Sequence, residues 1–279
     1  MSKPISADLV GLATDPVEVS WSEKDVLLYA LAVGCKPEAE LDFIYEARGP
    51  KVLPTFAVIP GLNIMGSVMA QVQFNLAMLL HGEQKITLHR PIPSSGKATG
   101  VGKIVEVWDK GKAAVIGVEC VVSDAEGPLF TTLATLFIRG AGGFGGERGP
   151  TRQMLQQPER EPDFLVEDIT REEQAALYRL TGDRNPIHID PNFAKFGGFE
   201  KPFLHGLCTY GFAGRAALSA LCDGDPSRFV SMSGRFSDQV YMGDAIITKV
   251  WNIEPGKVLM QVETQRGNVV LNQCEVCFS

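Results

Sequence analysis

The chain has 279 residues, of which 45% are hydrophobic and 21% charged, and its formal net charge is −7. This size accommodates one large domain or two ordinary ones, and the composition is that of a globular protein. The negative charge argues against nucleic acid as the main partner, because phosphate binding needs a basic excess, and no apolar run approaches the roughly 18 residues that cross a membrane.

Two predicted helices share the same start and stop signals. The first begins after Ser22, which an acid follows three residues later, and ends at Gly34. The second begins at Thr170, where a capping box with Glu173 is predicted to satisfy the free amides of the first turn, and ends at Gly182.

Each helix is followed later in the chain by a predicted three-strand meander with glycine-containing turns, at residues 97–139 and 244–278. Between the two copies lies the glycine-rich stretch 140–150, followed by a polar segment. The chain therefore reads as one unit used twice, with a boundary between units 1–150 and 151–279. The glycine-rich linker is either a flexible connector or a loop whose bare backbone lets a ligand approach closely.

The middle of each unit carries a further expected helix. Residues 202–221 alternate small and large side chains, which indicates a helix enclosed by a closely wrapped sheet. Residues 54–82 are rich in glycine and methionine and have a weaker helical period. We expect an α+β fold in which a curved antiparallel sheet wraps one helix, twice.

The chemistry lies in the turn after Gly182. Pro186 excludes the residue before it from the helical region, and Asp190 followed by proline predicts the start of another helix. Asp183 and His188 are therefore expected on an irregular segment that is clamped at both ends. Alone, each has a structural explanation, in which Asp183 caps its own turn and His188 is a satisfied core residue.

Taken together, these groups favour a site over the structural explanation. A carboxylate and an imidazole near one water can exchange its proton, one as base and the other as acid. Asn185 can orient that water, and the backbone N–H of Gly206 begins the enclosed helix, where it can meet a carbonyl oxygen. Other classes lack support, since neither a Gly-x-Ser-x-Gly elbow nor a dinucleotide fingerprint occurs.

The chain ends and the cysteines indicate a compartment. Residues 1–8 lack the apolar core of a signal peptide, and the last three residues are not a Ser-Lys-Leu signal. We expect a cytoplasmic protein with no membrane partner. Its six cysteines are then expected to be free, mostly buried thiols. Cys274 and Cys277 do not predict a zinc site, because they would face opposite sides of a strand and lack a second ligand pair.

At these residues the sequence resembles a known family. Residues 178–191, Tyr-Arg-Leu-Thr-Gly-Asp-Arg-Asn-Pro-Ile-His-Ile-Asp-Pro, match the signature of the (R)-specific type 2 enoyl-CoA hydratases of the MaoC-like group. The resemblance covers nearly the whole chain and extends to the hydratase-2 domain of peroxisomal multifunctional enzyme type 2. Further matches are Val52 to Phe56, Leu80 to Gln84, Gly142 to Gly146, Leu204 to Thr209, and Arg235-Phe236.

The resemblance implies a double hot-dog fold and reversible hydration of trans-2-enoyl-CoA to (3R)-3-hydroxyacyl-CoA in β-oxidation-type metabolism, by a homodimer without metal or cofactor. It implies an acid/base pair, an assisting amide and an oxyanion N–H, which are Asp183 with His188, Asn185 and Gly206. It implies four further residues that line the thioester site, which are His81, Gly82, Lys110 and Phe236. The first unit lacks the catalytic turn and would keep only the acyl-binding role.

Two alternatives remain open at this point: a hot-dog acyl-CoA thioesterase and a non-catalytic acyl-CoA binding subunit. The same fold and an activated water could cleave the thioester. The preferred acyl chain is not predicted, although the weak period of residues 54–82 suggests room for a long or bulky chain.

Overall fold

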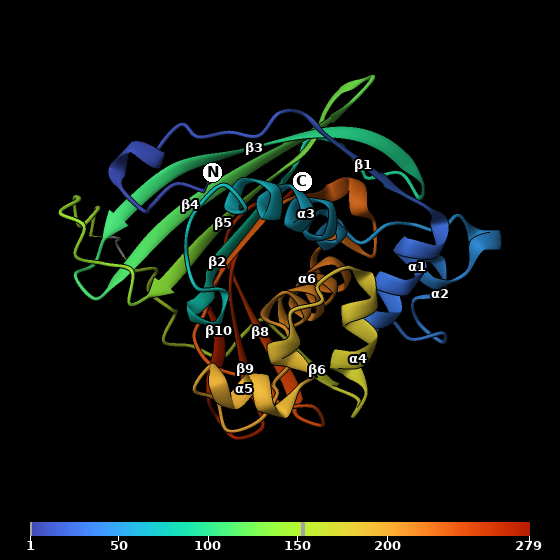
Figure 1. The fold of residues 1–279 in the computed structure, drawn as a ribbon. Helices are drawn as coiled ribbons and strands as arrows, with labels where there is room; N and C mark the ends of the chain where they lie inside the picture. The colour runs from blue at the N-terminus through green and yellow to red at the C-terminus, as the bar shows by residue number, and fades with distance from the viewer. Residues whose placement is uncertain (1, 152–153) are drawn as a thin grey trace.

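The structure is a computed structural model that describes residues 2–151 and 154–279, so Arg152 and Gln153 of the polar segment after the predicted linker lie outside the described residues. Ten strands form one antiparallel, strongly curved sheet, and two long helices lie on its concave side (Figure 1). None of the described helices is long and apolar enough to span a membrane. The six cysteines are free, and only Cys277 is not fully buried.

The first half contributes five strands and three α-helices. They are β1 (Val17–Trp21), α1 (Glu23–Ala32), α2 (Leu41–Ile44), α3 (Val58–Met69), β2 (Leu79–Leu88), β3 (Gly96–Asp109), β4 (Ala113–Asp124) and β5 (Gly127–Arg139). The second half repeats the pattern. Its elements are β6 (Phe164–Ile169), α4 (Gln174–Tyr178), α5 (Pro191–Phe196), α6 (Gly206–Cys222), β7 (Phe229–Phe236), β8 (Ala245–Glu254), β9 (Lys257–Thr264) and β10 (Val269–Phe278).

The strand order shows that the two halves are equivalent. It runs β1-β3-β4-β5-β2-β7-β10-β9-β8-β6, so each half has the same order outward from the β2/β7 junction. There the strands pair antiparallel, with Glu83 opposite Arg235. Helix α3 packs against β3 and β4, and α6 against β7, β8 and β10. This arrangement confirms the predicted α+β double hot-dog fold. We keep the division into units 1–150 and 151–279 as a proposal.

The predicted helix starts had different outcomes. The prediction for α1 is confirmed, because the Asp25 carboxylate accepts the N–H of Ser22 at 2.8 Å and the helix is followed by Gly34 at φ +87°. The capping box at Thr170 is wrong. Its hydroxyl donates to the carbonyl of Asp244 at 2.8 Å and accepts from the N–H of Gly243 at 2.9 Å. Because the loop before β8 uses this hydroxyl, α4 begins only at Gln174.

The predicted enclosed helix is confirmed as α6, most of which is buried. In the first half, where only a weak helical period was expected, α3 forms a regular helix. The expectation that the helical middle extends to Gly82 is wrong, because β2 begins at Leu79. Leu79 and Leu80 pair with Ile138 and Phe137 of β5, and this pairing makes them part of a strand despite the weak helical period of their sequence.

A largely buried ionic cluster centred on Arg215, in the middle of α6, joins the two halves. The guanidinium of Arg215 donates from Nη1 to both oxygens of Glu40 at 2.8 Å and from Nε to the carbonyl of Val33 at 3.0 Å. It also contacts the buried carboxylate of Asp168, which Lys36 reaches at 3.1 Å. The segment after α1 is thereby tied to the middle of α6.

The described part of the linker is organised by one carboxylate. Asp109, at the end of β3, accepts the N–H groups of Gly111 and Gly143 at 2.8 Å and that of Gly145 at 2.9 Å. These donors, Gly143 foremost, hold the pKa of Asp109 below its ordinary value. Here the bare glycine backbone approaches a carboxylate of the protein itself.

Candidate active site

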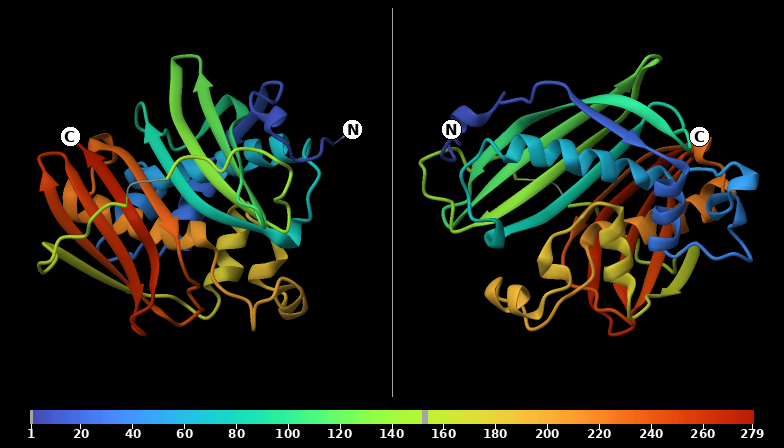
Figure 2. Two further views of the ribbon diagram at one scale, coloured as in Figure 1. Left: turned by 90° about the vertical axis from the view of Figure 1, so that its left-hand side faces the viewer. Right: turned by 45° about the vertical axis from the view of Figure 1, so that its right-hand side comes forward.

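The turn after α4 holds its side chains by local hydrogen bonds. It follows a short 3-10 helix and begins at Gly182, whose φ of +141° favours glycine. The Asp183 carboxylate accepts the N–H of Asn185 at 3.2 Å, and the Asn185 side-chain oxygen accepts the N–H of Ile187 at 3.2 Å. Helix α5, which follows this turn and is drawn in gold, lies apart from the strands of the sheet in both views of Figure 2. The predicted tight turn is confirmed, and Asp190 caps α5 as expected.

Asp183 and His188 lie close together beside His205. Each of the three offers a ligand atom within 4.8 Å of the others. The His188 Nδ1 lies 2.9 Å from the carbonyl oxygen of Phe203, and because a carbonyl only accepts, Nδ1 carries the hydrogen of the neutral ring. Its Nε2 is then left with a lone pair, which is the form that accepts a proton from water.

Burial brings the proton affinities of this pair toward each other. It raises the pKa of Asp183, and the charge of His188 opposes the rise. It lowers the pKa of His188, and the charge of Asp183 opposes the fall. A carboxyl with a raised pKa next to an imidazole with a lowered one can pass a proton at small cost, which suits acid/base chemistry near neutral pH.

Gly206 begins α6, with His205 as its N-cap. Its N–H belongs to the first turn, where helix donors have no partner within the helix and the helix dipole is positive. A β-carbon on Gly206 would lie 3.1 Å from Cδ1 of Phe236, so the aromatic ring packs closely on the backbone here. Because the N–H of Gly206 lies at the positive end of the helix dipole and Gly206 lines the cavity, it can stabilise a developing oxyanion there.

Four residues predicted from the resemblance lie on other elements. His81 and Gly82 are on β2, at a bulge between His81 and Glu83. The His81 ring lies 5.2 Å from that of Phe236 on β7, edge to face, and burial lowers the pKa of His81 to about 4. Lys110 follows β3, and its Nζ contacts the carbonyl of Arg148 in the linker.

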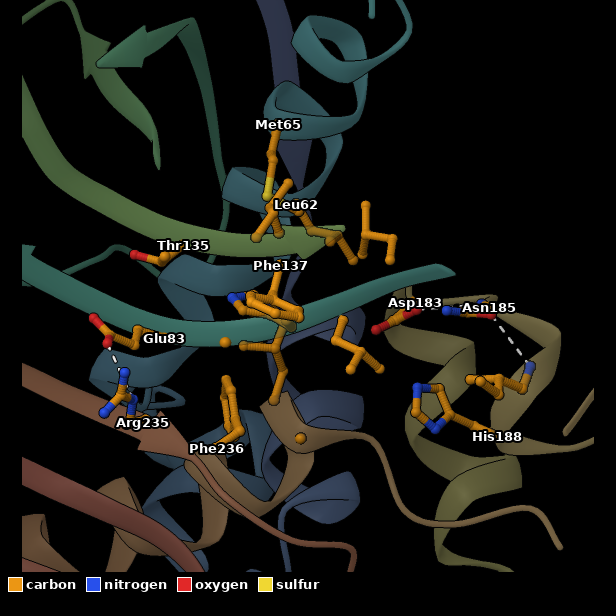
Figure 3. Close-up of a pocket in the computed structure, with 18 of the residues that line it drawn as sticks. Leu62, Met65, Glu83, Thr135, Phe137, Asp183, Asn185, His188, Arg235 and Phe236 are labelled. Atoms are coloured by element: carbon orange, nitrogen blue, oxygen red, sulfur yellow. Dashed lines mark hydrogen bonds and ion pairs between the residues drawn. The ribbon is translucent and has the colours of Figure 1, made fainter. Parts of the chain in front are cut away.

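All eight predicted site residues line one cavity of about 1190 Å³. Much of its apolar lining comes from α3 and the segment up to the start of β2, with Leu62, Met65, Met69, Val72, Phe74 and Leu79. Figure 3 shows Asp183 and His188 on one side of this cavity and the Glu83–Arg235 pair on the opposite side, with Phe236 between them. The structure thus brings the predicted residues together, while their individual roles stay predictions.

Sequence reasoning missed three features of the site. His205 has no sequence signal beyond its place before Gly206, although its ring contacts that of His188. Phe203 orients His188 through its backbone, which its residue type could not reveal. Arg235 pairs with Glu83, Nε to Oε1 at 3.3 Å, and its only signal was its place before Phe236 in a motif.

The site offers one arrangement with metal-ligand chemistry. Within residues 2–151 and 154–279, Asp183, His188 and His205 are the group of three side chains close enough to share an ion. Nε2 of His205 is already engaged, 3.1 Å from the backbone carbonyl oxygen of Asp183. The lone pair of the neutral His205 ring is then on Nδ1, which is buried and has no hydrogen-bond partner among the described residues.

Comparison with known proteins agrees with this geometry. Residues 19–140 match the MFE-2 hydratase 2 N-terminal domain, and residues 153–273 match the MaoC like domain. The chain is 43% identical to a probable enoyl-CoA hydratase 2 of Dictyostelium discoideum, covering 92% of this chain and 90% of that protein. It is 42% identical to 3-hydroxyacyl-thioester dehydratase Y of Mycobacterium tuberculosis, covering 93% and 91%. A crystal structure of a MaoC-like dehydratase from Phytophthora capsici superimposes with a TM-score of 0.89 at 33% identity, covering 99% and 98%.

Proposed function

Because the chain belongs to the MaoC-like family of type 2 enoyl-CoA hydratases, we propose that it hydrates trans-2-enoyl-CoA to (3R)-3-hydroxyacyl-CoA with Asp183 and His188 as its acid/base pair. It is a hydro-lyase of β-oxidation-type metabolism, and its substrate is an acyl-CoA. The observation that carries the residue assignment is the position of both side chains on one turn, in the same cavity as the N–H of Gly206.

The chemical step follows from these positions. The thioester oxygen accepts the Gly206 N–H, which draws electron density away from C3. One member of the pair takes a proton from water as the water oxygen bonds to C3. The electrons of the C2=C3 bond pass to C2 and the thioester oxygen as an enolate. The other member protonates C2, and one proton returned between the two groups or through solvent resets the site.

Three further residues shape the reaction. The oxygen of the Asn185 side chain is used within the turn, which leaves its amide N–H groups as the part that can orient the water. Lys110 places a cation in the cavity wall, and Arg235 places a second one there that is paired with Glu83. We propose that they face the anionic CoA portion, while the apolar wall of α3 takes the acyl chain.

The alternatives have less support. The similar proteins reported above are named hydratase and dehydratase, which favours hydration over thioester hydrolysis. A non-catalytic binding subunit would not need the Asp183, Asn185 and His188 set. The homodimer and the cytoplasmic location are proposals, and sedimentation velocity of the purified protein tests the first of them.

One assay separates these functions. The purified protein is incubated with a trans-2-enoyl-CoA while the absorbance of the enoyl thioester is followed, and a thiol reagent reports free CoA in parallel. We expect absorbance loss without thiol release, and chiral analysis should find the (3R) product. Thiol release at the rate of absorbance loss would establish the thioesterase instead, and saturable binding without turnover would establish the binding subunit.

A further inference from the structure

His205 lies against His188 but does not line the cavity, and it has no role in the acid/base pair. Its side chain is fully buried. Its ring centroid lies 3.9 Å from that of His188, at an interplanar angle of 33°, and 4.9 Å from that of Tyr178. The imidazole of His205 thus lies in contact with both the catalytic imidazole and the core tyrosine.

The hydrogen bond of His205 fixes its tautomer. Nε2 lies 3.1 Å from the backbone carbonyl oxygen of Asp183. Since a carbonyl only accepts, Nε2 must carry a hydrogen, and in the neutral ring Nδ1 carries none. Nδ1 is buried and has no hydrogen-bond partner among the described residues. A second proton on Nδ1 would therefore have nothing to bond to.

The surroundings of His205 keep the ring neutral. The ionisable groups that face it are Asp183, His188, Arg179 and the phenol of Tyr178. Burial lowers the pKa of His205 most strongly, the charges of His188 and Arg179 lower it further, and the bond to the Asp183 carbonyl opposes this shift. When His188 takes a proton during the reaction, His205 is thus disfavoured as a second charge 3.9 Å away.

The backbone of His205 belongs to the other half of the machinery. Its carbonyl accepts the N–H groups of Cys208 at 3.0 Å and Thr209 at 3.2 Å, so it forms the first turn of α6. The next residue is Gly206, whose N–H is the oxyanion donor. One residue therefore contacts the acid/base turn through its side chain and starts the oxyanion helix through its backbone.

We propose that His205 is a positioning residue that holds the acid/base turn and the Gly206 N–H at a fixed separation, through a neutral Nε2–H bonded to the Asp183 carbonyl. This role rests on the proposed hydratase function. A misplacement of about 1 Å between reacting groups can cost about 100-fold in rate, so loss of this bond acts on kcat more than on substrate binding.

The test compares three variants by steady-state hydration. His205→Phe keeps a planar ring but removes the donor, and we expect kcat to fall about 100-fold with KM changed less than about threefold. His205→Gln places an N–H near the Nε2 position and should restore at least about tenfold of that loss. His89→Phe removes a surface histidine whose Nε2 bonds to the Thr131 hydroxyl, and should leave both constants unchanged.

The outcomes are separable. A phenylalanine variant with kcat close to wild type, or a folded glutamine variant as slow as phenylalanine, overturns the positioning role. Wild type that hydrates no enoyl-CoA overturns the proposed function instead. If His205→Phe does not fold, nitrogen NMR of wild type decides. A ring protonated at Nε2 alone from pH 5.5 to 8 supports the proposal, and a doubly protonated ring at pH 6 refutes it.

Discussion

A β-carbon on Gly34 would lie 2.3 Å from Cε1 of Phe212, across the contact between α6 and the segment that follows α1. Gly34 also has a φ of +87°. No side chain fits this position without moving a buried aromatic ring of the other half.

We therefore expect Gly34→Ala to destabilise the protein by about 2–4 kcal/mol, from overpacking and from left-handed strain together. Gly267→Ala is the matched control, since Gly267 has a φ of +79° but open space around the added carbon. Urea unfolding should give a clearly smaller loss for the control. Equal losses would show that strain alone is responsible and that Phe212 moves freely.

The ionic cluster centred on Arg215 predicts a second loss of stability. Arg215→Met leaves the carboxylates of Glu40 and Asp168 buried without their shared cation, which costs about 3–5 kcal/mol. Lys36→Ala, whose side chain is 61% exposed, should cost at most about 1 kcal/mol. Denaturant midpoints of the two variants check this order, and a mild Arg215 variant would contradict it.

The acid/base assignment predicts loss of hydration without loss of fold. Asp183→Asn and His188→Ala should each reduce kcat by at least about 10²-fold, because neither replacement can exchange a proton with water. Asp190→Asn is the control on the same segment, since asparagine also caps a helix and this carboxylate accepts the N–H groups of Asn192 and Phe193 in the first turn of α5. Near-normal turnover in either catalytic variant, with circular dichroism unchanged, refutes the assignment.

The pKa shifts of two aspartates predict opposite pH effects on stability. The pKa of Asp183 is raised in the folded protein, so stability is lost as the pH rises through that pKa, and Asp183→Asn should melt at a higher temperature than wild type at pH 8. The pKa of Asp109 is lowered, so its carboxylate stabilises the fold above the unfolded pKa of about 3.9, and Asp109→Asn should melt at a lower temperature at pH 8.

Thermal unfolding at pH 4 and pH 8 checks both signs. The advantage of Asp183→Asn should shrink toward pH 4, where the carboxyl of wild type also becomes protonated. The deficit of Asp109→Asn should largely persist at pH 4, because the stabilisation by this carboxylate is lost only as the pH falls from about 3.9 through its lowered pKa. Shifts of the same sign for both variants at pH 8 would contradict the assigned environments.

The cavity wall formed by α3 predicts how acyl length can be altered. Gly66 lines the cavity, and a β-carbon there would meet no atom within 4 Å. Gly66→Phe should lower kcat/KM for long enoyl-CoAs at least about tenfold by filling this space, and leave short ones nearly unchanged. Gly66→Ala is the control. Uniform loss across chain lengths would place the acyl group elsewhere.

Much of this fold could be predicted because its signals are local. The predicted meander turns at Gly111, Gly127, Gly256 and Gly267 are present, and the structure adds that each of these glycines has a positive φ. Thr170 was mispredicted because its hydroxyl bonds to Gly243 and Asp244, which are distant in sequence. A capping motif shows what a side chain can bond to, but not which partner the tertiary fold supplies.

The site shows the same division. The turn from Gly182 to Asp190 could be predicted because its proline, glycine and cap are contiguous. The ring contact of His188 with His205 and the bond from His188 to the Phe203 carbonyl could not, since both depend on how the chain returns to the turn before α6. Equally, the pairing of Arg235 with Glu83 exists only because β2 and β7 meet at the centre of the sheet.

The equivalent segments after Gly34 and Gly182 both engage α6, one at its middle through Arg215 and the other at its first turn through His205. In the first half, the stretch that corresponds to the catalytic turn thus acts as an anchor for the helix that carries the oxyanion donor. We therefore expect turnover to depend on Arg215, although this residue lies away from the reacting groups. Loss of its ion pairs would let α6 shift along its axis and would displace the N–H of Gly206 from the thioester oxygen.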